Sequence, residues 1–356
     1  MTTMRFCFSP RGIVVMLTLV CTAAATSRGP IAEENRSRDT KIIGGTKIVP
    51  SVPIPWMASL KDSTTFHLCG GSVIAENVVL TAAHCIAQHE GMEWFDRRFP
   101  YVAVGNHDSN EQYLSLDSMI QPKISVIHPN YNETTVQSDI ALLFFDRTLT
   151  DLNGVTSVIR LPEKGQQVPS GSPVSIYGWG LISEDSIFPS NQMQRADVIL
   201  YDKDLCGKTS KYGPDALSYG MICAGNIEQG GVDSCAGDSG GPLVYNEGNN
   251  PVQIGVVSWG DGCGKPGYPG VYTETQAYLD WIEETIATVE AYKPLLSCFP
   301  NAVDGDLARL EDLELTRSTA LNLYGDCVGE TSAGGAQNNN FNVRDECVLL
   351  RDPCAA

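Results

Sequence analysis

The sequence DSCAGDSGGP, residues 233–242, says more about the fold and chemistry of this chain than any other stretch. Its Ser239 is surrounded by glycines, with Gly237 two residues before it and two more directly after it. Glycines beside a nucleophile let backbone N–H groups come close to a developing oxyanion, an interaction typically worth about 3–4 kcal/mol per donor. We therefore expect Ser239 to be a nucleophile and the N–H groups of Gly237 and Ser239 to form an oxyanion hole.

Two earlier segments supply the groups that such a serine needs. A serine hydroxyl is a weak nucleophile until a general base removes its proton, and a buried acid must hold that base in the correct tautomer. The segment TAAHC at 81–85 contains His84, and SDIALL at 138–143 contains Asp139. Each alone has a structural explanation, since a single histidine can be a packing residue and an acid before an apolar strand can belong to a turn. Together they predict a triad in which His84 is the base, Asp139 orients it and Ser239 attacks.

The size and composition of the chain fit a folded extracellular protein. It has 356 residues, of which 42% are hydrophobic and 19% charged, so it can bury a large core and wholesale disorder is excluded. The formal net charge of −18 makes binding to a phosphate backbone unfavourable, and we expect no nucleic-acid partner. The twelve cysteines indicate an oxidising compartment.

The N-terminus predicts secretion. Arg5 and Arg11 are followed by an apolar run at 13–25 that ends in three alanines, as in a secretory signal peptide with its cleavage site. The run is shorter than the roughly 20 residues that a membrane-spanning helix needs, so we expect no membrane span. Residues 1–25 are interpreted as the signal peptide, and the polar segment 26–41, which has no apolar periodicity, as an activation propeptide.

The main body, residues 42–289, has the pattern of an all-β protein. Short runs rich in Val, Ile, Tyr and Trp alternate with Gly, Pro, Asn and Asp, which favours an antiparallel sandwich or a pair of barrels. One amphipathic helix is expected at 277–289, where it closes this body. The expected strands include 101–104, 139–145, 174–177, 198–201 and 253–259.

The remaining segment, residues 290–356, is acidic and contains four cysteines. Four cysteines allow three disulfide pairings, and the sequence does not choose among them. Because the segment has no histidine and no C-x-x-C spacing, we expect no zinc site in it. It is interpreted as a disulfide-containing extension, either a solvated spacer or an adhesion or targeting module.

From residue 42 to about 288 the chain resembles the trypsin-like, chymotrypsin-fold serine proteases. The resemblance rests on IIGG, TAAHC, SDIALL, GDSGGP and VSWG, which occur here in the order of that family. It implies two orthogonally packed, antiparallel six-stranded β-barrels with a C-terminal helix, and catalytic groups at the junction of the barrels. It also implies a serine endopeptidase that needs no cofactor. Members that bind calcium use acids in the loop after the strand at 101–104, but Asn106 stands where a ligand is expected, so we expect no metal ion.

The resemblance also implies cleavage after Lys and Arg. Asp233 lies six residues before Ser239, where family members with this specificity have an acid at the base of the pocket. A buried carboxylate is costly unless a cation pairs with it, so apolar side chains are rejected. Proteins or peptides containing Lys or Arg are therefore the expected partners. Gly260 and Gly270 match pocket walls that bulky residues would block, and the full set of predicted substrate-binding residues is Asp233, Ser258, Trp259, Gly260 and Gly270.

Activation by proteolysis is a further implication. Cleavage after Lys41 would free Ile42 as an α-ammonium group, which in the family pairs with the acid beside the nucleophile, here Asp238. This new buried ion pair orders the pocket and the oxyanion hole, so release of the pro-segment acts as a switch. Since Lys41 is itself a tryptic site, the protein could activate itself.

The family pattern implies three disulfides in the body and leaves the four tail cysteines to pair among themselves. Val174 and Tyr245 occupy two positions that often form another bridge, and both cysteines are absent together. The implied pairs are Cys69–Cys85, Cys206–Cys223 and Cys235–Cys263.

Asn132 begins the sequon NET in an expected surface loop and is the predicted glycosylation site, whereas the sequon at Asn35 would leave with the propeptide. The other histidines match no catalytic position and are interpreted as surface or packing residues: His67, His89, His107 and His128.

The competing interpretation is a non-catalytic protein of the same fold that captures or inhibits another secreted protein. Such homologues usually lose a member of the triad, and none is lost here. We therefore expect a secreted, monomeric endopeptidase made as a zymogen, with protein inhibitors as further partners.

Overall fold

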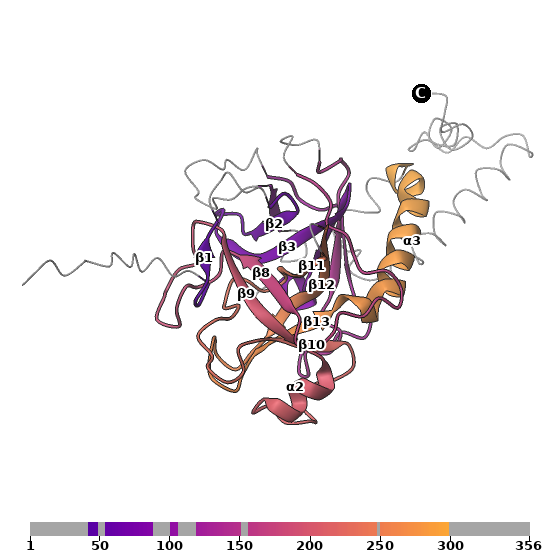
Figure 1. Ribbon diagram of the computed structural model, residues 1–356. Helices are drawn as coiled ribbons and strands as arrows, with labels where there is room; N and C mark the ends of the chain where they lie inside the picture. The colour runs from indigo at the N-terminus through magenta and orange to yellow at the C-terminus, as the bar shows by residue number, and fades with distance from the viewer. Residues whose placement is uncertain are drawn as a thin grey trace, which may run out of the picture. The chain divides into compact units, whose positions relative to one another are not determined.

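The strands that the structure describes form two antiparallel sheets, one from residues 57–144 and one from residues 173–274 together with a short strand at 46–47 (Figure 1). The computed structural model describes residues 42–48, 54–87, 100–105, 119–150, 156–247 and 250–298, the side chains of 247 and 292–298 excepted.

The first sheet has the strand order β5-β2-β3-β4-β7-β6. In its centre Val79 lies opposite Val73 on one side and Leu143 on the other. Every residue of β4 and of β7 is buried, so both faces of these strands are covered by other parts of the protein. The strands are β2 (Met57–Lys61), β3 (His67–Ala75), β4 (Val78–Thr81), β5 (Tyr101–Val104), β6 (Ile124–Ile127) and β7 (Ala141–Phe144).

The second sheet closes on itself, because β8 pairs with both β11 and β9. In β9 buried and more exposed residues alternate, as in a strand with one face on the core and one toward water. A short strand, β1 (Thr46–Lys47), also pairs with the start of β9. The six strands of the ring are β8 (Pro173–Gly178), β9 (Gln194–Tyr201), β10 (Met221–Gly225), β11 (Pro242–Glu247), β12 (Asn250–Trp259) and β13 (Gly270–Glu274).

These sheets confirm the predicted fold class, all-β with two six-stranded antiparallel units and a C-terminal helix. The residues that the structure describes include no ladder between β5 and β6, although an isolated bridge joins Val102 to Ile120. The ends of some strands differ from the prediction. The run expected at 198–201 begins at Gln194, and the run expected at 253–259 begins at Asn250.

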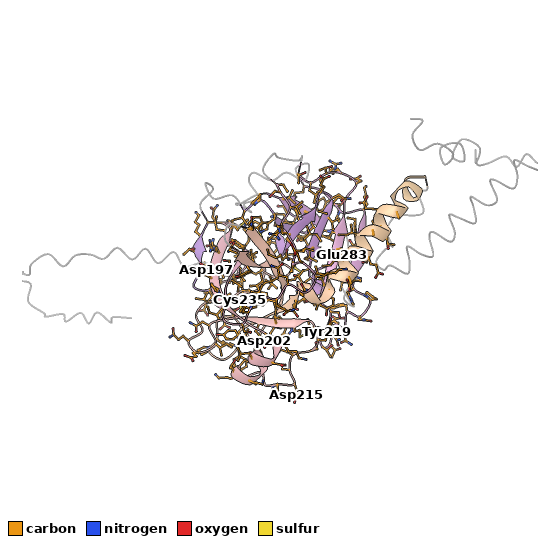
Figure 2. The ribbon with its side chains drawn as sticks, turned by 45° about the vertical axis from the view of Figure 1, so that its right-hand side comes forward. Asp197, Asp202, Asp215, Tyr219, Cys235 and Glu283 are labelled. Carbon is orange, nitrogen blue, oxygen red and sulfur yellow. A yellow bond between two sulfur atoms is a disulfide. The ribbon has the colours of Figure 1, made fainter. Side chains whose placement is uncertain are left out.

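The last helix, α3 (Leu279–Cys298), packs on the first sheet although it follows the second in the chain. Its Ile282 and Val289 belong to the same apolar cluster as Leu80 of β4. At the surface, the Nζ of Lys164 lies 2.6 Å from Asp280 and 2.9 Å from Glu283, which is labelled on α3 in Figure 2.

The predicted end of this helix is wrong. We expected a helix over 277–289, whereas a 3₁₀ turn, η3 (Thr275–Tyr278), leads into α3, which continues to Cys298. Val289 is the last residue of α3 in the core cluster whose side chain is described. The helix continues through the exposed Glu290 and Ala291, which are good helix formers, and past Pro294. The periodicity therefore located the buried face of the helix and not its end.

All three disulfides expected in the body are present. Val174 and Tyr245, at the positions of the missing bridge, pack in one apolar cluster. No helix in the described part of the chain is long and apolar enough to cross a membrane. Several predictions lie outside the described residues: those for 1–41, for 106–113, for His89 and His107, and for the tail after Cys298.

Candidate active site

His84 lies in a one-turn helix, α1 (Ala83–Ile86), directly after β4. The disulfide between Cys69 on β3 and Cys85 holds this turn against the sheet. The imidazole remains 27% exposed, so a substrate or a proton can reach it. The His84 ring is therefore partly exposed, and the helical turn that carries it is fixed to β3 by a disulfide.

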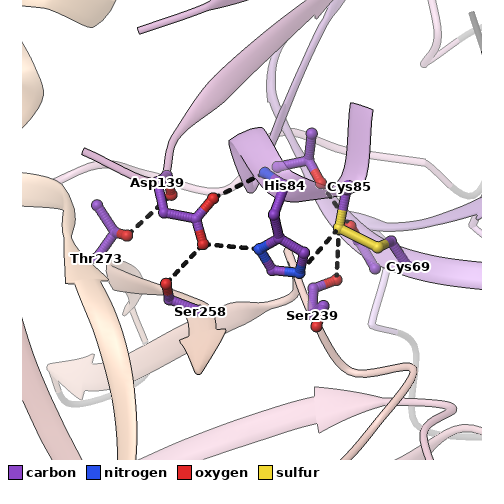
Figure 3. Close-up of polar contacts among 9 residues, drawn as sticks. Cys69, His84, Cys85, Asp139, Ser239, Ser258 and Thr273 are labelled. Carbon is purple, nitrogen blue, oxygen red and sulfur yellow. Dashed lines mark hydrogen bonds and ion pairs between the residues drawn. A yellow bond between two sulfur atoms is a disulfide. The ribbon is translucent and has the colours of Figure 1, made fainter. Parts of the chain in front are cut away.

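Asp139 precedes β7, is fully buried and holds His84 in one orientation (Figure 3). Its Oδ1 accepts the backbone N–H of His84 at 2.9 Å, and its Oδ2 lies 2.7 Å from Nδ1 of the imidazole. Ser258 Oγ donates to the same Oδ2 at 2.6 Å, and Thr273 Oγ1 donates to the backbone carbonyl of Asp139 at 2.9 Å. Because an ionised carboxylate only accepts hydrogen bonds, the proton of a neutral His84 ring is on Nδ1 and Nε2 is free to act as a base.

Ser239 lies next to His84 on the side opposite Asp139, as Figure 3 shows. The main chain around it is tightly fixed, since Ser239 O accepts the N–H of Gly70 at 2.7 Å. Gly237 and Gly240 have φ values of +97° and +80°, which favour glycine. A Cβ at Gly237 would also come within 3.0 Å of Gly180 Cα. The three residues of the predicted triad are therefore brought together from three distant parts of the chain.

His67 supports this region, a role that the sequence analysis missed. The ring is 5% exposed, and burial lowers its pKa to about 4, so it is neutral. Its Nε2 donates to the carbonyl of Gly237 at 2.8 Å, and its Nδ1 then accepts from Ser59 Oγ at 2.8 Å. His67 is buried, as expected of a packing residue, but it also fixes the carbonyl group of Gly237, the residue whose N–H is a predicted oxyanion donor. Its position on β3, two residues before Cys69, was the only signal available in the sequence.

A second buried carboxylate, Asp233, lies on the other side of the site with only 2% exposure. Its Oδ2 accepts the N–H of Gly264 at 2.9 Å, whereas its Oδ1 makes no hydrogen bond of good geometry, and the nearby N–H groups of Ser234 and Gly270 offset the cost of its burial only in part. Burial raises the pKa of Asp233 to about 7. A Cβ at Gly270 would come within 2.7 Å of Oδ1, so a larger residue there would press on the carboxylate.

The other predicted substrate-binding residues have different partners in the structure. A Cβ at Gly260 would lie 3.3 Å from the carbonyl of Gly262 and 3.9 Å from the hydroxyl of Tyr212. Trp259 packs edge-on against Tyr212, with ring centroids 5.1 Å apart. The hydroxyl of Ser258 bonds to Asp139, so any contact of Ser258 with a ligand would involve its backbone.

Asp238, the acid beside Ser239, is 2% exposed and lies against Gly178 at the end of β8 and Gly180 in the β8–β9 connection. Its Oδ1 accepts the N–H of Gly180 at 2.8 Å and its Oδ2 accepts the N–H of Cys235 at 3.0 Å. Burial raises its pKa to about 6. Ile42, the expected new N-terminus, is fully buried in the apolar cluster of the second sheet, and the carbonyl of Ile43 accepts the N–H of Asp233 at 3.2 Å.

One cluster of metal-ligand atoms occurs among the described residues, formed by Cys69, His84 and Cys85. Its two sulfur atoms are joined in a disulfide, so no thiolate is available to a metal ion. This cluster is therefore not a metal site. Asn132 is exposed in a turn where its Oδ1 accepts the N–H groups of Thr134 and Thr135.

Comparison with known proteins identifies the family. The family model described as Trypsin matches residues 42–282, more than half of the chain and the whole of the site above. This chain belongs to the trypsin family. It is 36% identical over 245 residues to Trypsin-1 of Astacus astacus, which covers 68% of this chain and 98% of that protein.

Two further relatives match about the same part of this chain but different shares of their own length. Trypsin Tyr p 3.0101 of Tyrophagus putrescentiae is 36% identical over 256 residues, covering 71% of this chain and 83% of that protein. Transmembrane protease serine 5 of Homo sapiens is 35% identical over 246 residues, covering 69% of this chain and 52% of that protein. The chain thus spans about half the length of the human relative.

Proposed function

We propose that this trypsin-family chain is a secreted serine endopeptidase that cleaves after Lys and Arg through His84, Asp139 and Ser239. The observation that carries the proposal is the pair formed by His84 Nδ1 and the buried Asp139, 2.7 Å apart, with Ser239 on the opposite side of the ring. This arrangement leaves Nε2 as the only basic atom of the neutral ring.

In the proposed reaction Ser239 Oγ attacks the substrate carbonyl carbon while its proton passes to Nε2 of His84. Asp139 stabilises the resulting imidazolium, and the N–H groups of Gly237 and Ser239 donate to the oxyanion. The C–N bond then breaks as the imidazolium gives its proton to the leaving amine. Water, activated by the same imidazole, hydrolyses the acyl-enzyme and regenerates Ser239.

The specificity rests on Asp233. Its unpartnered Oδ1 and raised pKa describe a carboxylate whose burial the protein itself compensates only in part. A Lys or Arg side chain would supply the missing donor and the missing positive charge, whereas an apolar side chain would leave both absent.

We further propose that cleavage after Lys41 activates the protein, with Asp238 as the acceptor of the new α-ammonium group of Ile42. Two observations support this step. Asp238 is a buried carboxylate whose hydrogen bonds come only from backbone N–H groups among the described residues, and Ile42 has a φ of +56°, which is strained for a β-branched residue. Cutting the bond before Ile42 removes the φ constraint and creates a cation that favours the ionised acid.

The three disulfides support secretion, since such bonds persist in oxidising compartments. Within this proposal residues 1–25 are a signal peptide, 26–41 a propeptide, 42–289 the peptidase domain and 290–356 an extension joined to it through α3. The protein would act as a monomer, carry a glycan on Asn132 and meet protein substrates and protein inhibitors.

The test is to cleave the purified precursor after Lys41 and compare reporter peptides ending in Lys or Arg with reporters ending in Phe or Leu. We expect turnover of the basic reporters only, and none by a Ser239→Ala protein. Equal turnover of both classes would contradict the specificity. Turnover no higher than that of Ser239→Ala would contradict catalysis and favour the non-catalytic interpretation.

The activation step is tested by a Lys41→Ala precursor treated with the same activating protease. We expect it to stay uncut and inactive while the wild-type precursor gains activity. A Lys41→Ala precursor with full activity would rule this mechanism out.

A further inference from the structure

The connection between β8 and β9 contacts two segments of the candidate active site, the loop before Ser239 and the 261–267 segment. A hydrogen bond from Ser190 N–H to Trp179 O, 2.6 Å long, joins the two ends of this connection. Beside the oxyanion loop, Leu181 N–H donates to Ala236 O at 2.8 Å. Further along, Glu184 of the same connection contacts the 261–267 segment, whose Gly264 N–H donates to Asp233.

Glu184 binds the main chain of that wall at one defined atom. Its Oε1 accepts the N–H of Cys263 at 3.0 Å, and the next N–H in the chain, that of Gly264, donates to Oδ2 of Asp233 at 2.9 Å. Two successive peptide groups are therefore held by two carboxylates, one at the surface and one inside the pocket. On the far side Cys263 is tied to Cys235 by a disulfide.

The local structure is built to let Glu184 approach. Gly262 has a φ of +73°, and a Cβ at this position would collide with Glu184 Oε1 and with the end of the Lys265 side chain. Lys265 Nζ lies 3.3 Å from Asp261 and 4.0 Å from Glu184, so one cation lies between two acids. These ion pairs are about half exposed and weak, and the hydrogen bond to Cys263 is the specific contact.

We propose that Glu184 is a positioning residue for substrate specificity, which fixes the Gly262–Cys263 peptide and thereby the peptide that follows it, so that Gly264 N–H stays aimed at Asp233. The inference rests on the proposed Lys/Arg specificity and assigns part of its affinity to a residue outside the pocket. Without Glu184 the N–H of Cys263 loses its carboxylate partner. The Cys235–Cys263 disulfide and the other hydrogen bonds of this segment still hold it, but the N–H of Gly264 is aimed less well at Asp233 and a cation binds less tightly. The His84–Asp139 pair is held by Ser258 and Thr273, so the chemical step is unaffected.

The experiment measures kcat and KM for a Lys reporter, together with the inhibition constant of benzamidine, a small aromatic cation that probes the pocket alone. In Glu184→Ala we expect KM and the inhibition constant to rise about threefold to fivefold, the range for an exposed charged contact, with kcat within twofold of wild type. Glu184→Gln keeps an oxygen acceptor and should restore both constants. Asp185→Ala, which removes an exposed acid next to it in the same connection, should leave both unchanged.

Gly262→Ala provides an independent perturbation, because its methyl group pushes Glu184 and Lys265 away from the wall, and it should raise both constants as Glu184→Ala does. Unchanged constants in Glu184→Ala would overturn the inference, as would an equal rise in Asp185→Ala, which would point to general charge. In both cases wild-type cleavage after Lys would leave the proposed function intact. Failure of the wild-type protein to bind benzamidine and to cleave after Lys or Arg would instead refute the proposed function.

Discussion

The two buried carboxylates that flank the site, Asp139 and Asp233, are equally hidden from water but differ in their partners. Both oxygens of Asp139 accept hydrogen bonds, from the backbone and ring of His84 and from Ser258. Asp233 accepts one well-formed hydrogen bond, from Gly264 to Oδ2, and its Oδ1 makes none of good geometry, although the N–H groups of Ser234 and Gly270 lie near enough to lower its pKa in part. Burying a charge is costly unless it is paired and hydrogen-bonded.

This difference separates a positioning group from a binding group. The protein itself provides the partners of Asp139, which is therefore fixed before any substrate arrives and can orient His84. Oδ1 of Asp233 can still accept a hydrogen bond from a ligand, so the free energy of the ionised carboxylate depends on whether a cation is bound beside it. Four predictions follow the comparison from the largest expected effect to the smallest.

Asp139→Asn should lower kcat for a Lys reporter about 10⁴-fold, because an amide in place of the carboxylate favours the wrong tautomer of His84 and does not stabilise the imidazolium. KM should change little, since Asp233 is untouched. Steady-state kinetics of the activated protein measures both, with the exposed Asp215→Asn as the control. A loss below tenfold would mean that Asp139 does not orient the base.

Asp233→Asn should lower kcat/KM for Lys and Arg reporters by about 30- to 5,000-fold, the cost of removing one partner of a buried charge pair. Turnover of Phe or Leu reporters should not fall, because these side chains never paired with the acid. The ratio of the two classes of reporter is the measurement, and Asp185→Asn is the control for loss of an exposed negative charge. Parallel losses for both classes would place Asp233 in general catalysis or folding.

The affinity of benzamidine should increase with pH. Burial raises the pKa of Asp233 to about 7, and only the ionised carboxylate attracts a cation, so binding should be about 100-fold weaker at pH 5 than at pH 8. Calorimetry on Ser239→Ala protein avoids any contribution from turnover. An affinity independent of pH would show that Asp233 is already ionised at pH 5, and therefore that the protein stabilises the buried carboxylate without a ligand.

Ser258→Ala should lower kcat about tenfold, the effect of losing one hydrogen bond to a charged group, worth about 1.5 kcal/mol. Thr273→Val is the matched variant, because Thr273 donates to the backbone carbonyl of Asp139 and not to its carboxylate. It should affect kcat less. Equal effects of the two variants would mean that packing around Asp139 matters more than its charge.

Much of the site could be predicted because its chemistry is concentrated in short motifs. The sequence analysis named His84, Asp139 and Ser239, and the structure brings them together. It also gave all three disulfides of the body, since each pair follows a pattern of the family that the sequence resembles.

The supporting residues could not be found in this way. His67, Thr273 and Glu184 are of common types, they lie in no distinctive motif, and their partners are far away in the chain. The end of α3 was missed for a related reason. Apolar periodicity reports burial, and α3 continues past the buried Val289 into the exposed residues Glu290 and Ala291.

The order of the motifs by itself determined which side chains could attack, accept a proton and bind a cation, because those properties belong to the residue types and to the glycines around them. Only the tertiary structure decided which acid is satisfied and which is left incomplete. That distinction depends on donors such as Ser258 and Gly264, which reach Asp139 and Asp233 only when the strands and loops that carry them are packed together.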